Sequence, residues 1–329
     1  MFLGVDGGGT KTAFCLLDES GQVRARATAA SSYYFSHGID LVGRVLAEGV
    51  AKVCETAGIA PSDIDYAFFA LPGYGESPGD LPVLDAIPRG VLGHDRYSCD
   101  NDMVCGWAGS LAAADGINVI SGTGSMTYGE RLGKGARVGG WGELFGDEGS
   151  AYWIAVRGLE AFSRMSDGRM PEGPLVGILR GHLKPVTDLD MIDIVYNRWR
   201  GDRGKIAALS RLVNEAAAAG DAAAAAILAR AGEELALLVD TTREQLRFGP
   251  DETVPVSYSG GTFTSTGVLE SFTKALSSRY DGYELRRPLY EPVIGAALYA
   301  AKLSGNPLSH RAQNALLSTS VFPAAGEDH

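Results

Sequence analysis

Three short glycine turns with neighbouring hydroxyl groups are the residues of this sequence best suited to chemistry. The first, Gly7–Thr12, follows the apolar run that opens the chain, and Ser121–Ser125 and Ser259–Thr262 follow later apolar runs. Glycine lets a backbone approach a ligand closely, so that successive N–H groups and a hydroxyl can surround a phosphate. One such turn is equally well explained by an ordinary β-hairpin, but three of them favour nucleotide binding.

Two common phosphate-binding patterns do not fit the first turn. A P-loop requires G-x-x-x-x-G-K-[ST]; the span from Gly4 to Gly9 has this spacing, but Thr10 separates Gly9 from Lys11. A dinucleotide-binding G-x-G-x-x-G turn opens a helix, whereas the residues after these turns have the pattern of a strand. We therefore expect a phosphate cradle formed by the turn of a β-hairpin.

Two aspartates are candidates for chemistry beside such a phosphate. Asp6 ends the first predicted strand, where a carboxylate could hold Mg²⁺ directly or through water. The alternative is a turn aspartate that binds local N–H groups. Asp102 follows Asn101 at the start of a predicted helix, and its position alone is typical of a helix cap or of a partner for the helix dipole.

The densest cluster of glycine, aromatic and acidic residues spans 139–150, directly before a predicted helix. Trp141 offers an apolar face on which a sugar or ring ligand can lie, and Asp147 can accept hydrogen bonds from hydroxyl groups. Alternatively, Asp147 or Ser150 caps the helix that follows. The segment is a candidate for binding the second substrate.

The elements that must position these residues alternate between strands and helices, which indicates an α/β architecture. One helical face carries Val42, Leu46, Val50 and Val53. The plan of strand, glycine turn and strand restarts at residue 117, which suggests two similar domains. The predicted strands are 2–6, 12–17, 22–28, 65–71, 97–99, 117–120, 126–128 and 254–258. The predicted helices are 39–58, 102–114, 150–164, 206–248 with a break at 219–221, and a final helix at about 293–303.

Composition and charge exclude several classes of function. Acids outnumber bases by 40 to 29, a formal charge of −11, which argues against nonspecific binding to nucleic acid or to an anionic membrane. No apolar run approaches the roughly 20 residues of a membrane span, and we expect no signal peptide. The cysteines form no C-x-x-C pair, so reduced thiols and a cytoplasmic location are expected. They are Cys15, Cys54, Cys99 and Cys105.

Together, these motifs resemble the N-acetylglucosamine kinase branch of the BadF/BadG/BcrA/BcrD ATPase family, within the sugar kinase, Hsp70 and actin superfamily. The resemblance covers about residues 2–303, and its most specific part is G-G-W-G-x-x-x-G-D-E-G-S-A-Y-W at Gly139–Trp153. It implies an α/β fold of two RNase H-like (actin-like ATPase) domains around a central cleft. We expect these domains at 1–115 and 116–329, the second with a helical insertion, and we expect helix 293–303 to pack back on the first.

The resemblance also implies roles for particular residues. It implies an ATP-dependent kinase that phosphorylates N-acetylglucosamine at the 6-hydroxyl, with Asp102 as catalytic base and Asp6 associated with Mg²⁺. A homodimer is implied as well, with sugar and ATP as the small-molecule partners. The residues expected at ATP are Gly8, Gly9, Thr10, Lys11, Gly122, Thr123, Gly124, Gly260 and Gly261. The residues expected at the sugar are Tyr33, Gly73, Asp102, Gly140, Trp141, Gly142 and Asp147.

The sequence departs from the family at the loop that binds the sugar. The family usually has an Asn after two small hydroxyl residues, whereas here Ser31 and Ser32 are followed by Tyr33. A phenol can donate one hydrogen bond but cannot reproduce the paired donor and acceptor of an amide. Glucosamine, N-acetylmannosamine and N-acetylmuramic acid therefore stay open as substrates.

A function of another class is found in relatives that are ATPases and activate dehydratases or reductases. They use a [4Fe–4S] cluster bridged between subunits, which requires four thiolates and therefore two cysteines from each chain of a symmetric dimer. Cys99 and Cys105 flank Asp102, which is the wrong place for such a cluster. We therefore favour the kinase.

Overall fold

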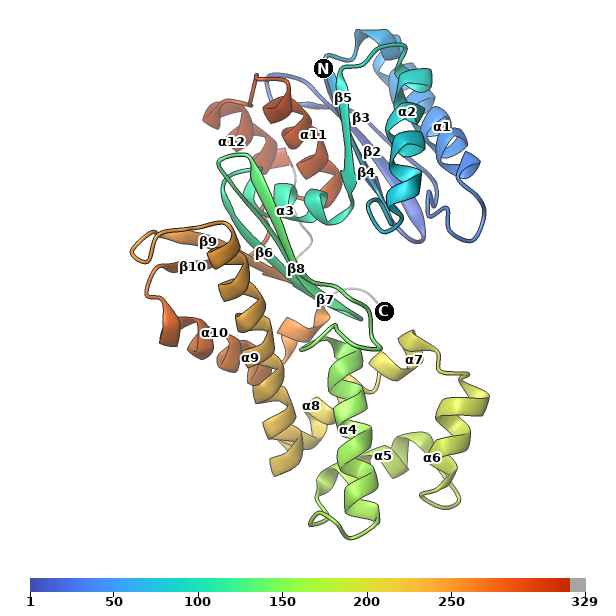
Figure 1. The fold of residues 1–329 in the computed structure, drawn as a ribbon, viewed down its shortest axis with the longest axis vertical. Coiled ribbons are helices and arrows are strands. Elements are labelled where there is room, and N and C mark those ends of the chain that lie inside the picture. The colour runs from blue at the N-terminus through green and yellow to red at the C-terminus, as the bar shows by residue number, and fades with distance from the viewer. Residues whose placement is uncertain (320–329) are drawn as a thin grey trace. The chain divides into compact units, whose positions relative to one another are not determined.

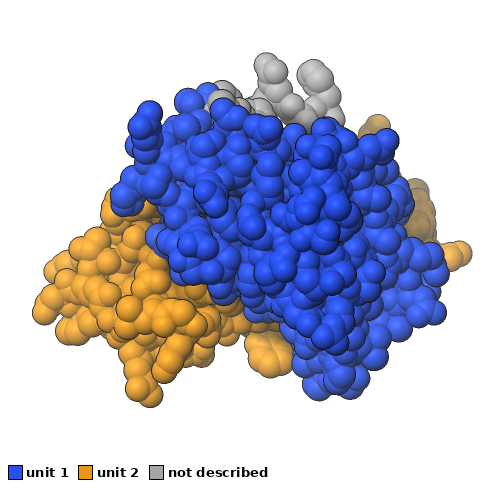
Figure 2. Space-filling model, turned by 90° about the horizontal axis from the view of Figure 1, so that it is seen from above, with its two compact units in different colours: residues 1–114, 287–329 blue, residues 115–286 orange. Residues whose placement is uncertain are grey.

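The computed structural model describes residues 1–319, and the chain divides into two compact units. Unit 1 comprises Met1–Ala114 together with the chain from Arg287 onward, and unit 2 comprises Asp115–Arg286 (Figures 1 and 2). The expected second domain, 116–329, differs from unit 2 at its end. Residues from 287 onward belong to unit 1, because the helix that follows packs on the first strand of the chain.

The sheet of unit 1 has the strand order β3-β2-β1-β4-β5. β1 lies at the centre: it pairs antiparallel with β2 and parallel with β4, β2 continues antiparallel to β3, and β4 continues parallel to β5. The carboxyl ends of the three parallel strands therefore share one edge of the sheet. The strands are β1 (Phe2–Gly7), β2 (Lys11–Leu17), β3 (Val23–Ala30), β4 (Tyr66–Leu71) and β5 (Tyr97–Asn101).

The sheet of unit 2 repeats this plan, with the order β10-β9-β6-β7-β8. β6 takes the place of β1: it pairs antiparallel with β7 on one side, which pairs with β8, and parallel with β9 on the other, which pairs with β10. The repeated plan predicted from the two glycine turns is confirmed. The strands are β6 (Gly116–Ser121), β7 (Ser125–Arg131), β8 (Lys134–Gly139), β9 (Val254–Ser259) and β10 (Tyr283–Arg286).

The helices of unit 1 cover its sheet with the faces that the periodicity predicts. Val42, Leu46, Val50 and Val53 of α1 are fully buried, and α1 packs on β2 and β3. Burying one such side chain stabilises the fold by about 1.5–3 kcal/mol, so this stripe anchors the helix. The helices are α1 (Asp40–Ala57), α2 (Leu81–Leu92), α3 (Met103–Leu111), α11 (Pro292–Leu303) and α12 (His310–Thr319), with short 3₁₀ turns at Pro61–Asp63 and Pro78–Asp80.

Helix α11 explains why the end of the chain belongs to unit 1. It packs on β1, β4 and α3, and a Cβ placed on its Gly295 would fall 2.0 Å from the backbone nitrogen of Gly109 in α3. This close approach clamps α3 against the centre of the sheet. α11 is not the final helix, because α12 follows it and buries Ala312 and Leu316.

Unit 2 carries most of its helices beside a long central one, α9. The predicted break at 219–221 is confirmed: α8 ends at Ala218, and Asp221 caps α9 by accepting the N–H of Ala224 at 3.0 Å. No helix within residues 1–319 has the length and apolar character that a membrane span requires. The helices are α4 (Ala151–Ser166), α5 (Pro174–Leu183), α6 (Asp190–Ile192), α7 (Arg203–Ala207), α8 (Ser210–Ala218), α9 (Ala222–Gln245) and α10 (Thr266–Arg279), with a π-helix at Asp193–Arg198 and a 3₁₀ turn at Gly261–Thr264.

Candidate active site

The first glycine turn joins β1 to β2, as predicted for a hairpin. The N–H of Gly8 donates to the carbonyl of Lys11 at 2.9 Å and closes the turn. Gly9, Thr10 and Lys11 are exposed, and a Cβ placed on Gly9 would meet no atom within 4 Å. The turn therefore presents open backbone to a ligand.

Asp6 precedes this turn at the carboxyl end of β1, in a setting that disfavours its charge. The pKa of Asp6 is raised to about 6: burial is the largest cause, the negative charge of Asp102 also raises the pKa, and the positive charge of Lys11 lowers it. The charge of Asp102 reaches Asp6 because β1 and β5 end at the same edge of the sheet. Asp6 is in register with Ala70 of β4, and Ala70 is in register with Asp100 of β5. The sheet thus brings two sequence-predicted acids together in unit 1.

The side chain of Asp102 does not cap the helix that follows it. Asp102 has helical backbone angles and makes no capping hydrogen bond. The side chain of Asn101 binds the start of the helix instead, because its Oδ1 accepts the N–H of Met103 at 3.2 Å. Asn101 Nδ2 also donates to the carbonyl of Tyr74 at 3.0 Å. The alternative that the Asp102 side chain caps this helix is therefore wrong, whereas its position at the start of α3 still fits a partner for the helix dipole.

The segment that contains Tyr33 lies beside the first turn. Ser31 Oγ donates to the carbonyl of Gly8 at 2.8 Å and accepts the N–H of Tyr33 at 3.1 Å. Phe35 covers Gly73, since a Cβ placed on Gly73 would fall 2.5 Å from the Phe35 ring. Tyr33, predicted at the sugar, is thus linked through Ser31 to the turn that follows Asp6. Gly73, also predicted at the sugar, contacts Phe35 of the same segment.

In unit 2, the turn Gly122–Gly124 joins β6 to β7 and sits on the start of α4. The N–H of Gly122 donates to the carbonyl of Gly124 at 2.9 Å, and the N–H of Ala151 donates to the carbonyl of Gly122 at 2.8 Å. Ser121 Oγ donates to the carbonyl of Gly149 at 3.0 Å. The second turn and the 139–150 segment are therefore one connected structure.

The third glycine turn lies directly against the second. Gly260 has a φ of +102°, and a Cβ there would fall 2.1 Å from the carbonyl oxygen of Ser121. This contact follows from the parallel pairing of β6 and β9, in which Ile120 is in register with Ser259. Gly260 is required both for its backbone angle and for the close approach. Gly122 and Gly261 remain open, with no atom within 4 Å of an added Cβ.

Asp147 has a different partner from the one its sequence position suggests. Ser150 caps α4 by accepting the N–H of Trp153 at 3.1 Å, while the Asp147 carboxylate pairs with Arg203 of α7. Asp147 is 3% exposed and has a φ of +57°. Trp141, in contrast, is 70% exposed, so its ring is open to a ligand.

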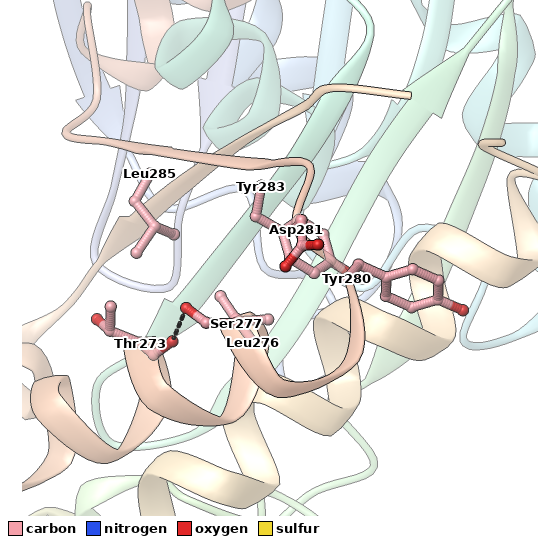
Figure 3. A pocket seen from close by; sticks show the side chains of 7 residues that line it. All are labelled: Thr273, Leu276, Ser277, Tyr280, Asp281, Tyr283 and Leu285. Atoms are coloured by element: carbon pink, nitrogen blue, oxygen red, sulfur yellow. Dashed lines mark hydrogen bonds between the residues drawn. The ribbon is translucent and has the colours of Figure 1, made fainter. Parts of the chain in front are cut away.

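The predicted residues divide into one set in each unit. The set in unit 1 contains Asp6, Gly8, Gly9, Thr10, Lys11, Tyr33, Gly73 and Asp102; the set in unit 2 contains Gly122, Thr123, Gly124, Gly140, Trp141, Gly142, Asp147, Gly260 and Gly261. A cavity of about 330 Å³ is lined by Thr273, Leu276, Ser277, Tyr280, Asp281, Tyr283 and Leu285 of α10, β10 and their connection (Figure 3). It contains none of these residues.

One residue of the unit 2 set was not predictable from its own neighbourhood. Arg203 contacts Asp147 across 56 positions of sequence, but it is one of several arginines in a charged stretch. Its only local signal is Asp202, which caps α7 by accepting the N–H of Lys205 at 2.9 Å. That signal marks the start of a helix and indicates no partner for the arginine.

Two units with the same five-stranded plan, each with a glycine turn after its first strand, define an actin-like ATPase fold of the kind found in sugar kinases. Residues 3–300 match the model of the BadF/BadG/BcrA/BcrD ATPase family. The chain belongs to this family.

Curated relatives match the chain over nearly its whole length. The N-acetyl-D-glucosamine kinase of Dictyostelium discoideum is 31% identical over 311 residues, which is 91% of this chain and 97% of the relative. The N-acetylmuramic acid/N-acetylglucosamine kinase of Clostridium acetobutylicum is 29% identical over 300 residues, with the same two shares. A crystal structure from Chromobacterium violaceum, provisionally described as an N-acetylglucosamine kinase, has a TM-score of 0.63 and 26% identity, and the match covers 90% of this chain and 97% of that one.

Proposed function

We propose that this protein is an ATP-dependent amino-sugar kinase that phosphorylates N-acetylglucosamine at its 6-hydroxyl group. The amino-sugar kinase class rests on the family and on the activities of the curated relatives. The observation that carries the chemistry is the edge of unit 1, where Asp6 and Asp102 interact beside an open glycine turn. One acid can serve the phosphate side and the other the attacking hydroxyl.

Asp102 is the proposed catalytic base. Its position after β5 is fixed by Asn101 and by the packing of α3 under α11, and its carboxylate is not used for capping. Asp102 would orient the sugar hydroxyl and take its proton as the phosphoryl group moves in line. The open backbone at Gly9 and Thr10 would hold the phosphate oxygens.

The unit 1 edge also fits Mg²⁺, although the described residues form no complete cage for it. Within residues 1–319, no cluster of three or more His, Cys, Asp or Glu side chains is placed to bind a metal. Mg²⁺ in kinases is typically bound by one or two carboxylates and the phosphates of the substrate, and Asp6 supplies a half-buried oxygen donor beside a second acid. When bound, Mg²⁺ neutralises charge on the phosphate oxygens.

The remaining proposed contacts divide by substrate. The backbone of the contacting turns at Gly122–Gly124 and Gly260–Gly261 is proposed for ATP, with Gly8–Lys11 on the phosphates. The sugar is assigned to Tyr33, Gly73, Gly140, Trp141, Gly142 and Asp147. Support comes from the exposed ring of Trp141 and from the connection of Tyr33 to the first turn through Ser31. We also propose a cytoplasmic, homodimeric enzyme.

The burial of Cys99 and Cys105 argues against the alternative function, an activator ATPase with an iron–sulfur cluster. Cys105 is fully buried with its Sγ 3.7 Å from the carbonyl of Val5, and Cys99 is part-buried with its Sγ 3.9 Å from the carbonyl of Leu84. Burial raises the pKa of both thiols above the usual range, and nearby aspartates raise it further. Cluster ligands must be thiolates at a subunit surface, and neither side chain meets that condition.

A sugar panel tests the proposal. ADP release from ATP and Mg²⁺ is measured alone and with N-acetylglucosamine, glucosamine, N-acetylmannosamine or N-acetylmuramic acid. We expect release that depends on sugar, with the highest kcat/KM for N-acetylglucosamine. A higher kcat/KM for another sugar changes the substrate, and sugar-independent release at the full rate excludes the kinase.

The site of phosphorylation needs its own control. 6-Deoxy-N-acetylglucosamine keeps the other groups of the sugar but lacks the proposed acceptor, so it should bind as an inhibitor without giving product. Phosphorus NMR of the normal product should show coupling to the two protons on C6. Turnover of the 6-deoxy sugar would move the acceptor to another hydroxyl.

A further inference from the structure

The ion pair between Arg203 and Asp147 lies on the surface of the Gly122–Gly124 turn. Arg203 Nη2 donates to Asp147 Oδ2. A Cβ placed on Gly124 would fall 2.6 Å from that Nη2 and 2.7 Å from that Oδ2. The pair therefore packs against the backbone of Gly124, where only glycine leaves it room. One guanidinium thus connects the turn proposed for ATP to the acid proposed for the sugar.

Arg203 lies on a short helix that packs against the rest of unit 2. It begins α7, which packs on α4 and buries Ile206. Arg203 Nε also lies 3.3 Å from Glu143 Oε2, so the guanidinium bridges both ends of the 143–147 loop. The contact with Glu143 is an ion pair without a hydrogen bond, whereas Nη2 makes a directed, charge-assisted hydrogen bond to Asp147.

Asp147 needs this partner because it is almost fully buried. A buried carboxylate is costly unless it is paired and hydrogen-bonded. Arg203 satisfies Oδ2, whereas Oδ1 accepts no hydrogen bond from any residue that the structure describes. Oδ1 is therefore the oxygen that can accept a hydrogen bond from a hydroxyl group of a ligand.

We propose that Arg203 is a positioning residue of the kinase, which holds Asp147 against the Gly122–Gly124 turn with Oδ1 directed to a sugar hydroxyl. The inference rests on the proposed function, because it takes Asp147 as a sugar contact. It implies that the sugar contact and the nucleotide turn are coupled through one ion pair.

Kinetics of three variants test the proposal. In Arg203→Met, the KM for the sugar should rise at least about tenfold while kcat falls less than about threefold, because saturating sugar restores the complex. Arg203→Lys should lie between Arg203→Met and the wild type. Arg211→Met, which removes an exposed arginine of α8, is the matched control and should leave KM unchanged. A purely structural role predicts loss of active enzyme at unchanged KM.

A double-mutant cycle isolates the pair. If Arg203 acts through Asp147, adding Arg203→Met to Asp147→Asn should raise the sugar KM no further. Additive effects, or a sugar KM within twofold of the wild type in Arg203→Met, would overturn the proposal.

Hydrogen exchange of the ligand-free protein separates this inference from the proposed function. Arg203→Met should speed the exchange of amides in both 122–124 and 147–151, and Arg211→Met should not. Unchanged exchange at 122–124 overturns the coupling even if no sugar in the panel is phosphorylated. In that case the absence of turnover counts against the kinase alone.

Discussion

The carboxylates of Asp6 and Asp102 interact at the carboxyl edge of the unit 1 sheet. Burial is the larger cause of the raised pKa of Asp6, about 6, and Asp102 adds to it. Between about pH 4 and pH 6, Asp6 is therefore protonated in the folded protein and ionised in the unfolded chain. The stability that this group contributes is present below about pH 4 and is lost as the pH rises through 6.

Asp6→Asn should consequently stabilise the protein at neutral pH. At pH 7.5, in EDTA, we expect the free energy of unfolding to rise by on the order of 1–3 kcal/mol, because a pKa raised from about 4 to about 6 corresponds to that range. The gain should shrink toward zero at pH 4. Urea unfolding at both pH values measures it, with the exposed Asp40→Asn as the control; a gain that does not change with pH would contradict the prediction.

Asp102→Asn should separate catalysis from binding. The amide keeps the shape of the side chain but cannot accept the proton of the hydroxyl, so kcat should fall by about 10²-fold or more. Sugar affinity, measured by calorimetry, should stay within a fewfold of the wild type. Retention of near-normal kcat would remove Asp102 from the role of base.

Alanine at Gly260 should lower stability, whereas alanine at Gly261 should affect only ATP binding. Gly260→Ala places a Cβ 2.1 Å from the Ser121 carbonyl at a positive φ, which should cost about 2 kcal/mol or more and lower Tm. Gly261→Ala meets no atom within 4 Å, so Tm should hold. If ATP lies against this turn, Gly261→Ala should still weaken ATP binding about tenfold. Normal ATP affinity in Gly261→Ala would exclude close approach of the nucleotide there.

Substitution of Tyr33 should change the choice of sugar. Its side chain is 40% exposed, and its backbone is tied to Ser31. Tyr33→Asn restores an amide and removes bulk, so the ratio of kcat/KM for N-acetylglucosamine to that for N-acetylmuramic acid should shift at least about fivefold. Tyr33→Phe removes only the hydroxyl and should shift the ratio less. An unchanged ratio in both variants would place Tyr33 outside the sugar pocket.

Local periodicity was sufficient to predict much of the fold. The buried stripe of α1, the hairpin turns after β1 and β6, and the break before α9 all depend on residues close in sequence. Helix α2 was not predicted, because its two prolines, Pro82 and Pro88, are residues that normally interrupt a helix. Pro88 nevertheless lies inside the helix and is buried.

The candidate site was predictable only in part, because some of its features depend on contacts between distant residues. The three glycine turns and the two aspartates, Asp6 and Asp102, could be predicted directly from the sequence. The contact of Gly260 with Ser121 depends on how β9 pairs with β6, and the pair of Arg203 with Asp147 depends on the left-handed backbone of Asp147. Neither pattern is visible in a linear sequence.

The discontinuity of unit 1 has a consequence for biosynthesis. β1 (Phe2–Gly7) is synthesised long before α11 (Pro292–Leu303), the helix that covers one of its faces. Unit 2 is continuous and can complete its own sheet while that apolar surface of β1 and β4 still lacks its cover. During synthesis, this apolar face of the unit 1 sheet therefore stays uncovered until α11 has been made.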